Sequence, residues 1–154
     1  MLIGLIADTH GLVRPEALRA LEGVELIIHA GDVGGAAVLT ALSAVAPVRA
    51  VSGNVDTVDG TLVESLDYVF DGVRVHVSHG HELGRPTPDR LAARYAADVI
   101  VYGHTHRALV EHVGAALVVN PGAAGPARFN LKPSIALLTL PQRDVRIVPL
   151  IPPL

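Results

Sequence analysis

Seven side chains that can bind metal ions follow apolar segments of the sequence, close to the points where these segments end. They are Asp8, His10, Asp32, Asn54, His79, His104 and His106. Carboxylate, amide and imidazole groups are ligands of divalent ions such as manganese, iron and zinc. The Asp-x-His and His-x-His spacings also allow two side chains of one loop to close on the same ion. Seven ligands are too many for one tetrahedral site, so they predict two ions that share a bridging carboxylate.

A site of this composition would attract a phosphate group. Two divalent ions outweigh the charge of two carboxylates and one bridging hydroxide, which leaves a net charge of about +1. Two ions about 3.5–4 Å apart can also generate the hydroxide and stabilise both the attacking and the leaving oxygen of a displacement reaction. The seven residues therefore indicate hydrolysis of a phosphate ester.

The apolar segments before these side chains are predicted to be β-strands. Their composition is typical of strands that are covered on both faces. They lie at residues 2–7, 26–29, 48–51 and 99–102. An Asp71-Gly72 pair between two alternating segments, 66–70 and 73–77, predicts a hairpin. Helical patterns occur at residues 15–21, 36–45 and 88–97.

Alternating strands and helices in the first part of the chain, followed by strand-rich sequence, predict an α/β protein. The strand pattern is compatible with one mixed sheet or with two sheets packed face to face and helices outside. In either case ligands gather at the carboxyl ends of parallel strands, so the seven side chains should converge. The Pro-rich segment 149–154 is expected to be a frayed tail.

Length and composition indicate a single folded domain over residues 1–154, with half of the residues hydrophobic and 18% charged. The absence of cysteine excludes disulfides, thiolate metal sites and cysteine nucleophiles. A net charge of −3 and five aromatic residues disfavour a dedicated nucleic-acid surface. The first segment is too short for a signal peptide or a membrane span, so we expect a cytoplasmic protein without a membrane partner. The apolar fraction favours a homo-oligomer, either a dimer or a tetramer.

Six short motifs resemble those of the calcineurin-like metallophosphoesterases, and the similarity runs from Met1 to about Leu140. The motifs are Asp8-x-His10, Gly31-Asp32, Gly53-Asn54, His79-Gly80-His81, Gly103-His104-x-His106 and Asn120-Pro121-Gly122. The pattern is most similar to the short bacterial and archaeal phosphodiesterase branch. That branch has a eukaryotic relative that serves as a scaffold subunit of retromer.

The resemblance implies a four-layer α/β/β/α sandwich of two mixed β-sheets flanked by helices. It also implies how the ligands divide between the two ions. Asp32 would bridge them, and the remaining six would bind one ion each, in the sets Asp8, His10, His106 and Asn54, His79, His104. Such enzymes usually work with manganese, although iron, zinc, nickel or cobalt can occupy the same ligands.

One position departs from the pattern of many relatives. Those relatives have a histidine directly after the Gly-Asn pair, where it protonates the leaving group or orients the substrate, whereas this chain has Val55. Valine cannot donate a proton, so esters with poor alkoxide leaving groups should react slowly. The small members of the branch that this chain resembles commonly lack the histidine and are similar to phosphodiesterases, and this resemblance implies diesters rather than monoesters as substrates. We predict Asp32, Asn54 and His81 as catalytic residues, with His81 as the substitute acid. Asn54, His81 and Arg128 are predicted to contact a small phosphate-ester substrate.

One other function is compatible with the same motifs, and two further ones are excluded by missing residues. A non-catalytic metal-binding scaffold or protein-interaction subunit on the same fold stays open as the alternative. A metallo-β-lactamase would need an Asp-His pair shortly after His106, and residues 107–110 contain none. Glycine-rich nucleotide-binding motifs are absent as well. His29 is expected to hold the following loop by hydrogen bonds, and His76 to lie on the opposite sheet face from its valine neighbours.

Overall fold

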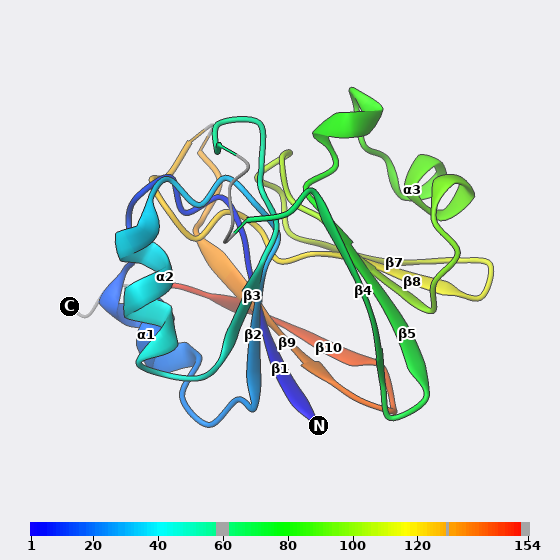
Figure 1. Ribbon diagram of the computed structural model, residues 1–154, viewed down its shortest axis with the longest axis horizontal. Helices are drawn as coiled ribbons and strands as arrows, with labels where there is room; N and C mark the ends of the chain where they lie inside the picture. Colours follow the sequence, from blue (N-terminus) through cyan, green and yellow to red (C-terminus); the bar gives the residue numbers. More distant parts are fainter. Residues whose placement is uncertain (58–61, 129, 152–154) are drawn as a thin grey trace.

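Two five-stranded mixed sheets pack face to face in the computed structural model, which describes residues 1–57, 62–128 and 130–151 (Figure 1). The first sheet has the order β10-β9-β1-β2-β3. Its strands are β1 (Leu2–Ile6), β2 (Leu26–His29), β3 (Val48–Ala50), β9 (Ser134–Thr139) and β10 (Asp144–Pro149). The second sheet has the order β4-β5-β6-β8-β7. Its strands are β4 (Ser65–Phe70), β5 (Val73–Ser78), β6 (Val99–Val101), β7 (Leu109–Val113) and β8 (Ala116–Asn120).

Helices cover the outer face of each sheet. The helical elements are α1 (Pro15–Ala20), α2 (Ala36–Ser43), α3 (Pro88–Arg94) and the 3₁₀ turn η1 (His81–Leu83). The first two helices bury Ala17 and Leu42 against the first sheet, and α3 buries Leu91 against the second. The arrangement confirms the predicted four-layer α/β/β/α sandwich (Figure 1).

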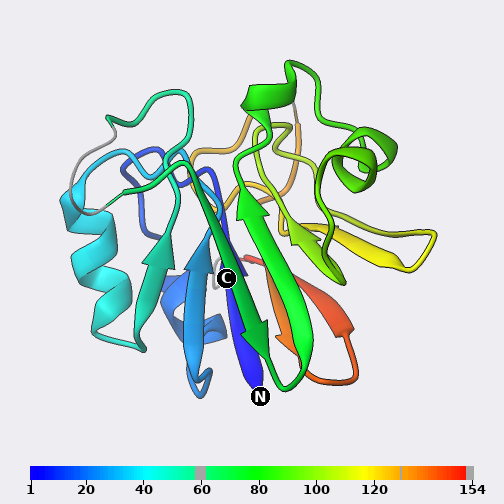
Figure 2. The same ribbon diagram turned by 45° about the vertical axis from the view of Figure 1, so that its right-hand side comes forward.

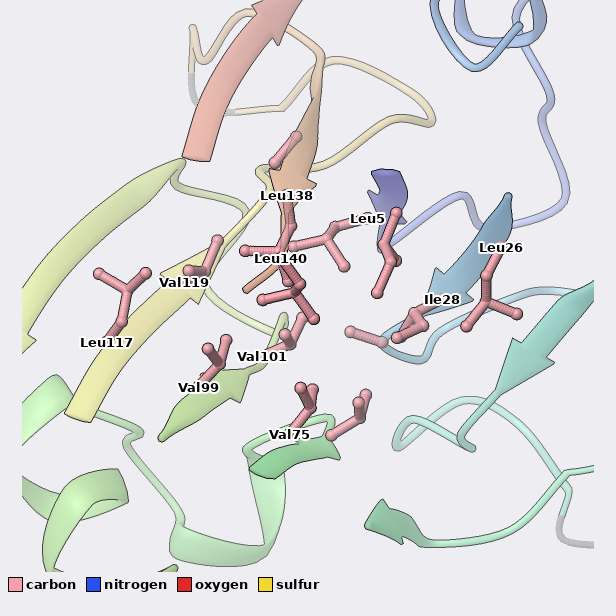
Figure 3. Close-up of a cluster of buried hydrophobic side chains, with 14 of the residues drawn as sticks. Leu5, Leu26, Ile28, Val75, Val99, Val101, Leu117, Val119, Leu138 and Leu140 are labelled. Atoms are coloured by element: carbon pink, nitrogen blue, oxygen red, sulfur yellow. The ribbon is translucent and has the colours of Figure 1, made fainter. Parts of the chain in front are cut away.

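The core between the sheets consists of aliphatic side chains from both of them (Figure 3). Leu5 and Ile28 point into this core, whereas their neighbours Ile6 and Ile27 pack against the helices. All four side chains are fully buried, which explains why these strands are continuously apolar rather than alternating. Each such side chain contributes about 1.5–3 kcal/mol of hydrophobic stabilisation.

The predicted hairpin is confirmed, with β4 and β5 paired from Ser65↔Ser78 to Phe70↔Val73. Asp71 and Gly72 form its turn with φ angles of 51° and 78°. Two consecutive left-handed residues match the twist of a two-residue hairpin, and aspartate followed by glycine is a favoured pair there.

Most predicted boundaries agree with the structure to within two residues, and two predictions at the ends of elements are wrong by more. The helix expected over 88–97 ends at Arg94, because Tyr95 adopts an extended backbone (φ −120°, ψ 128°) and stacks on His76 from β5. The tail expected over 149–154 is ordered at its start. Pro149 of β10 pairs with Ser134 of β9, and Leu150 is 4% exposed. Residues 152–154 lie outside the described residues.

The loops that carry the predicted ligands gather at one end of the molecule. Strands β1, β2 and β3 run parallel in the first sheet, and β5, β6 and β8 run parallel in the second. In Figure 2 the arrows of β3 and β5 point toward the same end. The two sheets therefore bring the loops after five different strands together, as the sequence predicts.

Candidate metal centre

Five of the seven predicted ligands have a left-handed backbone, which is unfavourable for residues with a side chain. The φ angles are 53° at Asp8, 45° at His10, 55° at Asp32, 72° at His104 and 63° at His106. In the described part of the chain, only three other non-glycine residues have a positive φ. Such conformations cost on the order of 1 kcal/mol or more each, and they concentrate at functional sites. The fold therefore holds these five residues in strained backbone conformations that direct their side chains toward the site.

The first cluster of candidate ligands comes from the loops after β1 and β6. Asp8 Oδ1 lies 3.9 Å from His10 Nε2 and 3.6 Å from His106 Nε2. One ligand atom of each of the three residues lies within 4.8 Å of the other two. These residues are the set that the resemblance assigned to the first ion.

A second cluster adjoins the first and shares Asp8 with it. Asp8 Oδ1 is 3.8 Å from His79 Nε2, and Asp32 Oδ2 is 3.2 Å from the same nitrogen. Asp32 Oδ2 also lies 3.6 Å from His10 Nε2 of the first cluster. Asp32 thus faces one histidine of each cluster, which is the placement that a bridging carboxylate needs.

Asn54 and His104 complete the second cluster. Asn54 Oδ1 lies 3.2 Å from His104 Nδ1, and the His104 ring centroid is 5.2 Å from that of His79. The backbone N–H of His104 donates to Asp8 Oδ2 at 3.1 Å. The structure therefore brings all seven predicted ligands together at one end of the two sheets.

The donor atoms at the centre of the clusters suit a cation. Asp8 Oδ1, His10 Nε2 and His79 Nε2 are buried and have no hydrogen-bond partner among the described residues. Leaving buried polar atoms unsatisfied is costly, and a bound cation removes that cost. His79 donates its Nδ1 proton to the carbonyl of Ala30 at 2.8 Å, which leaves the Nε2 lone pair of a neutral ring for a metal. The residues present therefore fit a metal centre.

Burial and mutual contacts separate the pKa values of the two carboxylates. Burial raises the pKa of Asp8 to about 7, although the nearby His79 opposes this effect. Burial also acts to raise the pKa of Asp32, but the contact with His79 outweighs it and lowers that pKa to about 2. Burial lowers the pKa of His106 to about 4, with help from His10. His106 is therefore neutral at pH 7, the form that binds metals.

Two glycines in the motifs leave room for the ligands. A Cβ atom on Gly53 would collide with Asp32 Oδ1, and one on Gly103 would lie 2.9 Å from Asp8 Oδ2. Real Cβ atoms essentially never come this close to a neighbour. Both glycines are therefore needed for the carboxylates to reach their positions.

Asp56 holds two of the ligand loops together, a role that the sequence reasoning missed. Its carboxylate accepts hydrogen bonds from the backbone N–H groups of Val33 and Gly34, both at 3.0 Å, and of Gly53 at 2.9 Å. These bonds link the loop of Asp32 to the loop of Asn54. A local signal was available only for the bond to Gly53, because aspartate often accepts a hydrogen bond from a backbone N–H of its own turn.

Asn120, which the sequence analysis named in a motif without giving it a role, is a second positioning residue. Its amide group donates to the carbonyl of Gly103 at 3.0 Å and to Thr105 Oγ1 at 3.1 Å, and its Oδ1 accepts from Gly122 N–H at 2.9 Å. The residue is fully buried at the end of β8. It therefore supports the loop that carries His104.

The predicted substrate contacts lie at the rim of the site. His81 is exposed in η1, and its ring centroid is 6.3 Å from that of His104. Arg128 is exposed, and its positive charge contributes to lowering the pKa of His10, after burial, which is the main cause. Val55 donates its backbone N–H to Asp32 Oδ1 at 3.1 Å, and the residue as a whole is 55% exposed.

His29 and His76 have structural roles. His29 accepts a hydrogen bond from Gly31 N–H at Nδ1 (3.1 Å), and its Nε2 lies 3.0 Å from Thr9 Oγ1. Because Thr9 donates its own proton to Val33, the ring must be neutral and carry its proton on Nε2. His76 pairs with Asp67 at 2.8 Å and lies on the outer face of β5. Both expectations are confirmed.

Residues 1–143 match the family model of the calcineurin-like phosphoesterase superfamily domain. This chain belongs to that superfamily. A probable metallophosphoesterase of Methanothermobacter thermautotrophicus is 36% identical, over 91% of this chain and 86% of the relative. Phosphodiesterase MJ0936 of Methanocaldococcus jannaschii is 29% identical, over 95% of this chain and 97% of the relative. Vps29 of Entamoeba histolytica in complex with zinc is similar in structure, with a TM-score of 0.83 and 25% sequence identity. The similarity covers 96% of this chain and 90% of the Vps29 chain.

These comparisons confirm the resemblance and the metallophosphoesterase fold. Family membership implies divalent metal ions, which agrees with the two clusters of candidate ligands. In the described part of the chain, no helix has both the length and the apolar character needed to cross a membrane.

Proposed function

We propose that the protein is a dinuclear metal-dependent phosphodiesterase. The observation that carries this proposal is the pair of adjoining ligand clusters, which share Asp8 and are connected through Asp32. Relatives that are named phosphodiesterases support the same reaction class. A small phosphate diester is the proposed substrate.

The residues would hold two ions in the division that the resemblance implies. Asp32 would lie between them, and His79 is already oriented by its bond to Ala30. When bound, such ions supply a hydroxide nucleophile at neutral pH and offset the charge of the phosphate. Manganese is the proposed metal, and iron, zinc, nickel or cobalt can use the same oxygen and nitrogen donors.

Residues at the rim would bind and orient the phosphate. The exposed Asn54 amide can donate hydrogen bonds to a phosphate oxygen, and the Arg128 guanidinium can pair with its negative charge. Val55 places no proton donor above Asp32, so an ester whose leaving group needs no proton should react fastest. We assign His81 as the donor for less reactive leaving groups, because it stands at the open side of the second cluster.

Hydrolysis of bis(p-nitrophenyl) phosphate with added manganese tests this function. Asp32→Ala and His104→Ala should abolish metal-dependent hydrolysis, because each removes a ligand of the clusters. His112→Ala is the matched control, since this histidine is exposed on β7. If the wild type shows no manganese-dependent activity above the two ligand variants, the proposal is wrong.

A non-catalytic scaffold on the same fold is the alternative. The strained backbone at five ligands favours the enzyme over the scaffold, because costly conformations of this kind concentrate at active sites. Elemental analysis combined with the hydrolysis assay separates the two functions. About two ions per chain together with manganese-dependent hydrolysis supports the enzyme, whereas bound ions without hydrolysis, or a small fraction of one ion, favour the scaffold.

A further inference from the structure

A polar cleft extends from the metal centre toward α3. It has a volume of about 450 Å³ and lies between the loop after β3, the start of β4 and the end of α3. Asn54 and His81 line it, and both belong to the candidate active site, so the cleft opens beside the position of the phosphate. Binding sites for small molecules commonly have volumes of about 300–1,000 Å³. The cleft is therefore large enough for the organic part of a phosphate ester.

Tyr95 forms a fixed wall of this cleft. Its ring stacks on His76 with centroids 3.8 Å apart and an interplanar angle of 20°, and its hydroxyl donates to Glu82 Oε2 at 2.7 Å. Glu82 Oε1 in turn accepts from the backbone N–H of Gly80 at 2.9 Å, directly after the ligand His79. The wall is thus tied to the metal centre, and a ligand would meet groups that are already oriented, which lowers the entropic cost of binding.

The charge of the cleft favours one class of ligand over another. Asp56, Glu64 and Glu82 line it, and Arg94 is the only Lys or Arg among its described lining residues. This excess of negative charge repels a second phosphate group. Carboxylate oxygens accept hydrogen bonds from hydroxyl groups, and the Tyr95 oxygen, whose proton goes to Glu82, can accept one as well. The cleft therefore offers several acceptors to a neutral ligand that has several hydroxyl groups.

We propose that this cleft binds the organic substituent of a phosphodiester and selects a substituent that is uncharged and carries several hydroxyl groups, such as a glycerol or a sugar. The inference rests on the proposed function, because it assigns the second part of the same substrate. Hydroxyl groups of the substituent bind Glu64, Glu82 and Tyr95 while the phosphate lies at the ligand clusters.

Three p-nitrophenyl phosphodiesters test the inference: the methyl, the glyceryl and the phosphoglyceryl ester. All three release p-nitrophenolate. Because the hydroxyl next to the glyceryl ester oxygen can itself displace p-nitrophenolate and form a cyclic phosphate, chromatography of the products isolates the kcat/KM of hydrolysis, and differences in that value report on the other substituent. With manganese-loaded protein, kcat/KM for the glyceryl ester should be about tenfold higher than for the methyl ester, which is the effect of one good hydrogen bond to a charged acceptor. The kcat/KM for the phosphoglyceryl ester should be lower than that for the glyceryl ester.

Two substitutions with a matched control assign these differences to the cleft. Tyr95→Phe should lower the ratio of glyceryl to methyl ester about threefold, because it removes one acceptor. Glu64→Lys should raise the ratio of phosphoglyceryl to glyceryl ester about fivefold or more, because it reverses a charge in the cleft. Glu22→Lys makes the same charge change in the exposed turn between α1 and β2, at the opposite end of the first sheet, and should leave that ratio unchanged.

The outcomes separate this inference from the proposed function. Equal kcat/KM values for the glyceryl and methyl esters, or equal effects of Glu64→Lys and Glu22→Lys, overturn the inference and leave the phosphodiesterase standing. If none of the three esters is hydrolysed, the proposed function fails. Calorimetry with glycerol phosphate and methyl phosphate then decides about the cleft: tighter binding of glycerol phosphate supports the inference, and equal binding overturns it.

Discussion

Replacing Asp56 by alanine should loosen the two ligand loops that this carboxylate connects. The substitution leaves the backbone N–H groups of Val33, Gly34 and Gly53 without their acceptor. A hydrogen bond contributes about 1 kcal/mol net, so the loss of three lowers the free energy of unfolding by about 3 kcal/mol. In a protein of this length, 1 kcal/mol changes the melting temperature by about 2–4 °C. We therefore expect Asp56→Ala to melt about 6–12 °C below the wild type.

Circular dichroism of metal-free protein measures this decrease without any contribution from bound ions. Asp144→Ala is the control, because it removes an exposed aspartate at the start of β10, far from the ligand loops. The melting temperature of Asp56→Asn should lie between those of Asp56→Ala and the wild type, since the asparagine amide keeps one acceptor oxygen. A melting temperature of Asp56→Ala within about 2 °C of the control would refute the role of Asp56 in connecting the loops.

Three further predictions follow from the site. Burial lowers the pKa of His29 to about 3, so the unfolded chain binds this proton first as pH falls. His29 should therefore contribute a loss of stability of up to about 1.4 kcal/mol per pH unit between pH 6.5 and pH 3, and in urea titrations the difference in stability between the wild type and His29→Gln should change with pH by this slope. Because the metal-free pKa of Asp8 is about 7, a proton competes with the metal, and calorimetry should show tighter manganese binding at pH 8 than at pH 6. A Cβ atom at Gly53 would displace Asp32, so Gly53→Ala should weaken manganese binding at least about tenfold. Gly23→Ala strains a turn away from the ligands (φ 87°) without crowding any atom, so it should leave manganese binding unchanged.

The ligands could be predicted from the sequence because local signals identify them. Each one follows a short apolar segment, and parallel strands bring such positions to the same end of a sheet. The hairpin was equally local, because Asp71 and Gly72 favour the left-handed turn that the structure contains. In both cases neighbouring residues determine the geometry.

Features that depend on distant parts of the chain could not be predicted. Asp56 contacts backbone groups that lie 22 and 23 residues away, and no local pattern reports such a contact. The end of α3 depends on where Tyr95 meets His76 of β5, and the order of Leu150 on a backbone bond to Pro133. The sharing of Asp8 by both ligand clusters likewise depends on how the two sheets pack.

Anomalous diffraction from crystals grown with excess manganese tests the central claim most directly. We expect two peaks about 3.5–4 Å apart, with Asp32 between them and the six other ligands divided around them. A single peak, or seven side chains that face protein atoms only, would contradict the dinuclear centre.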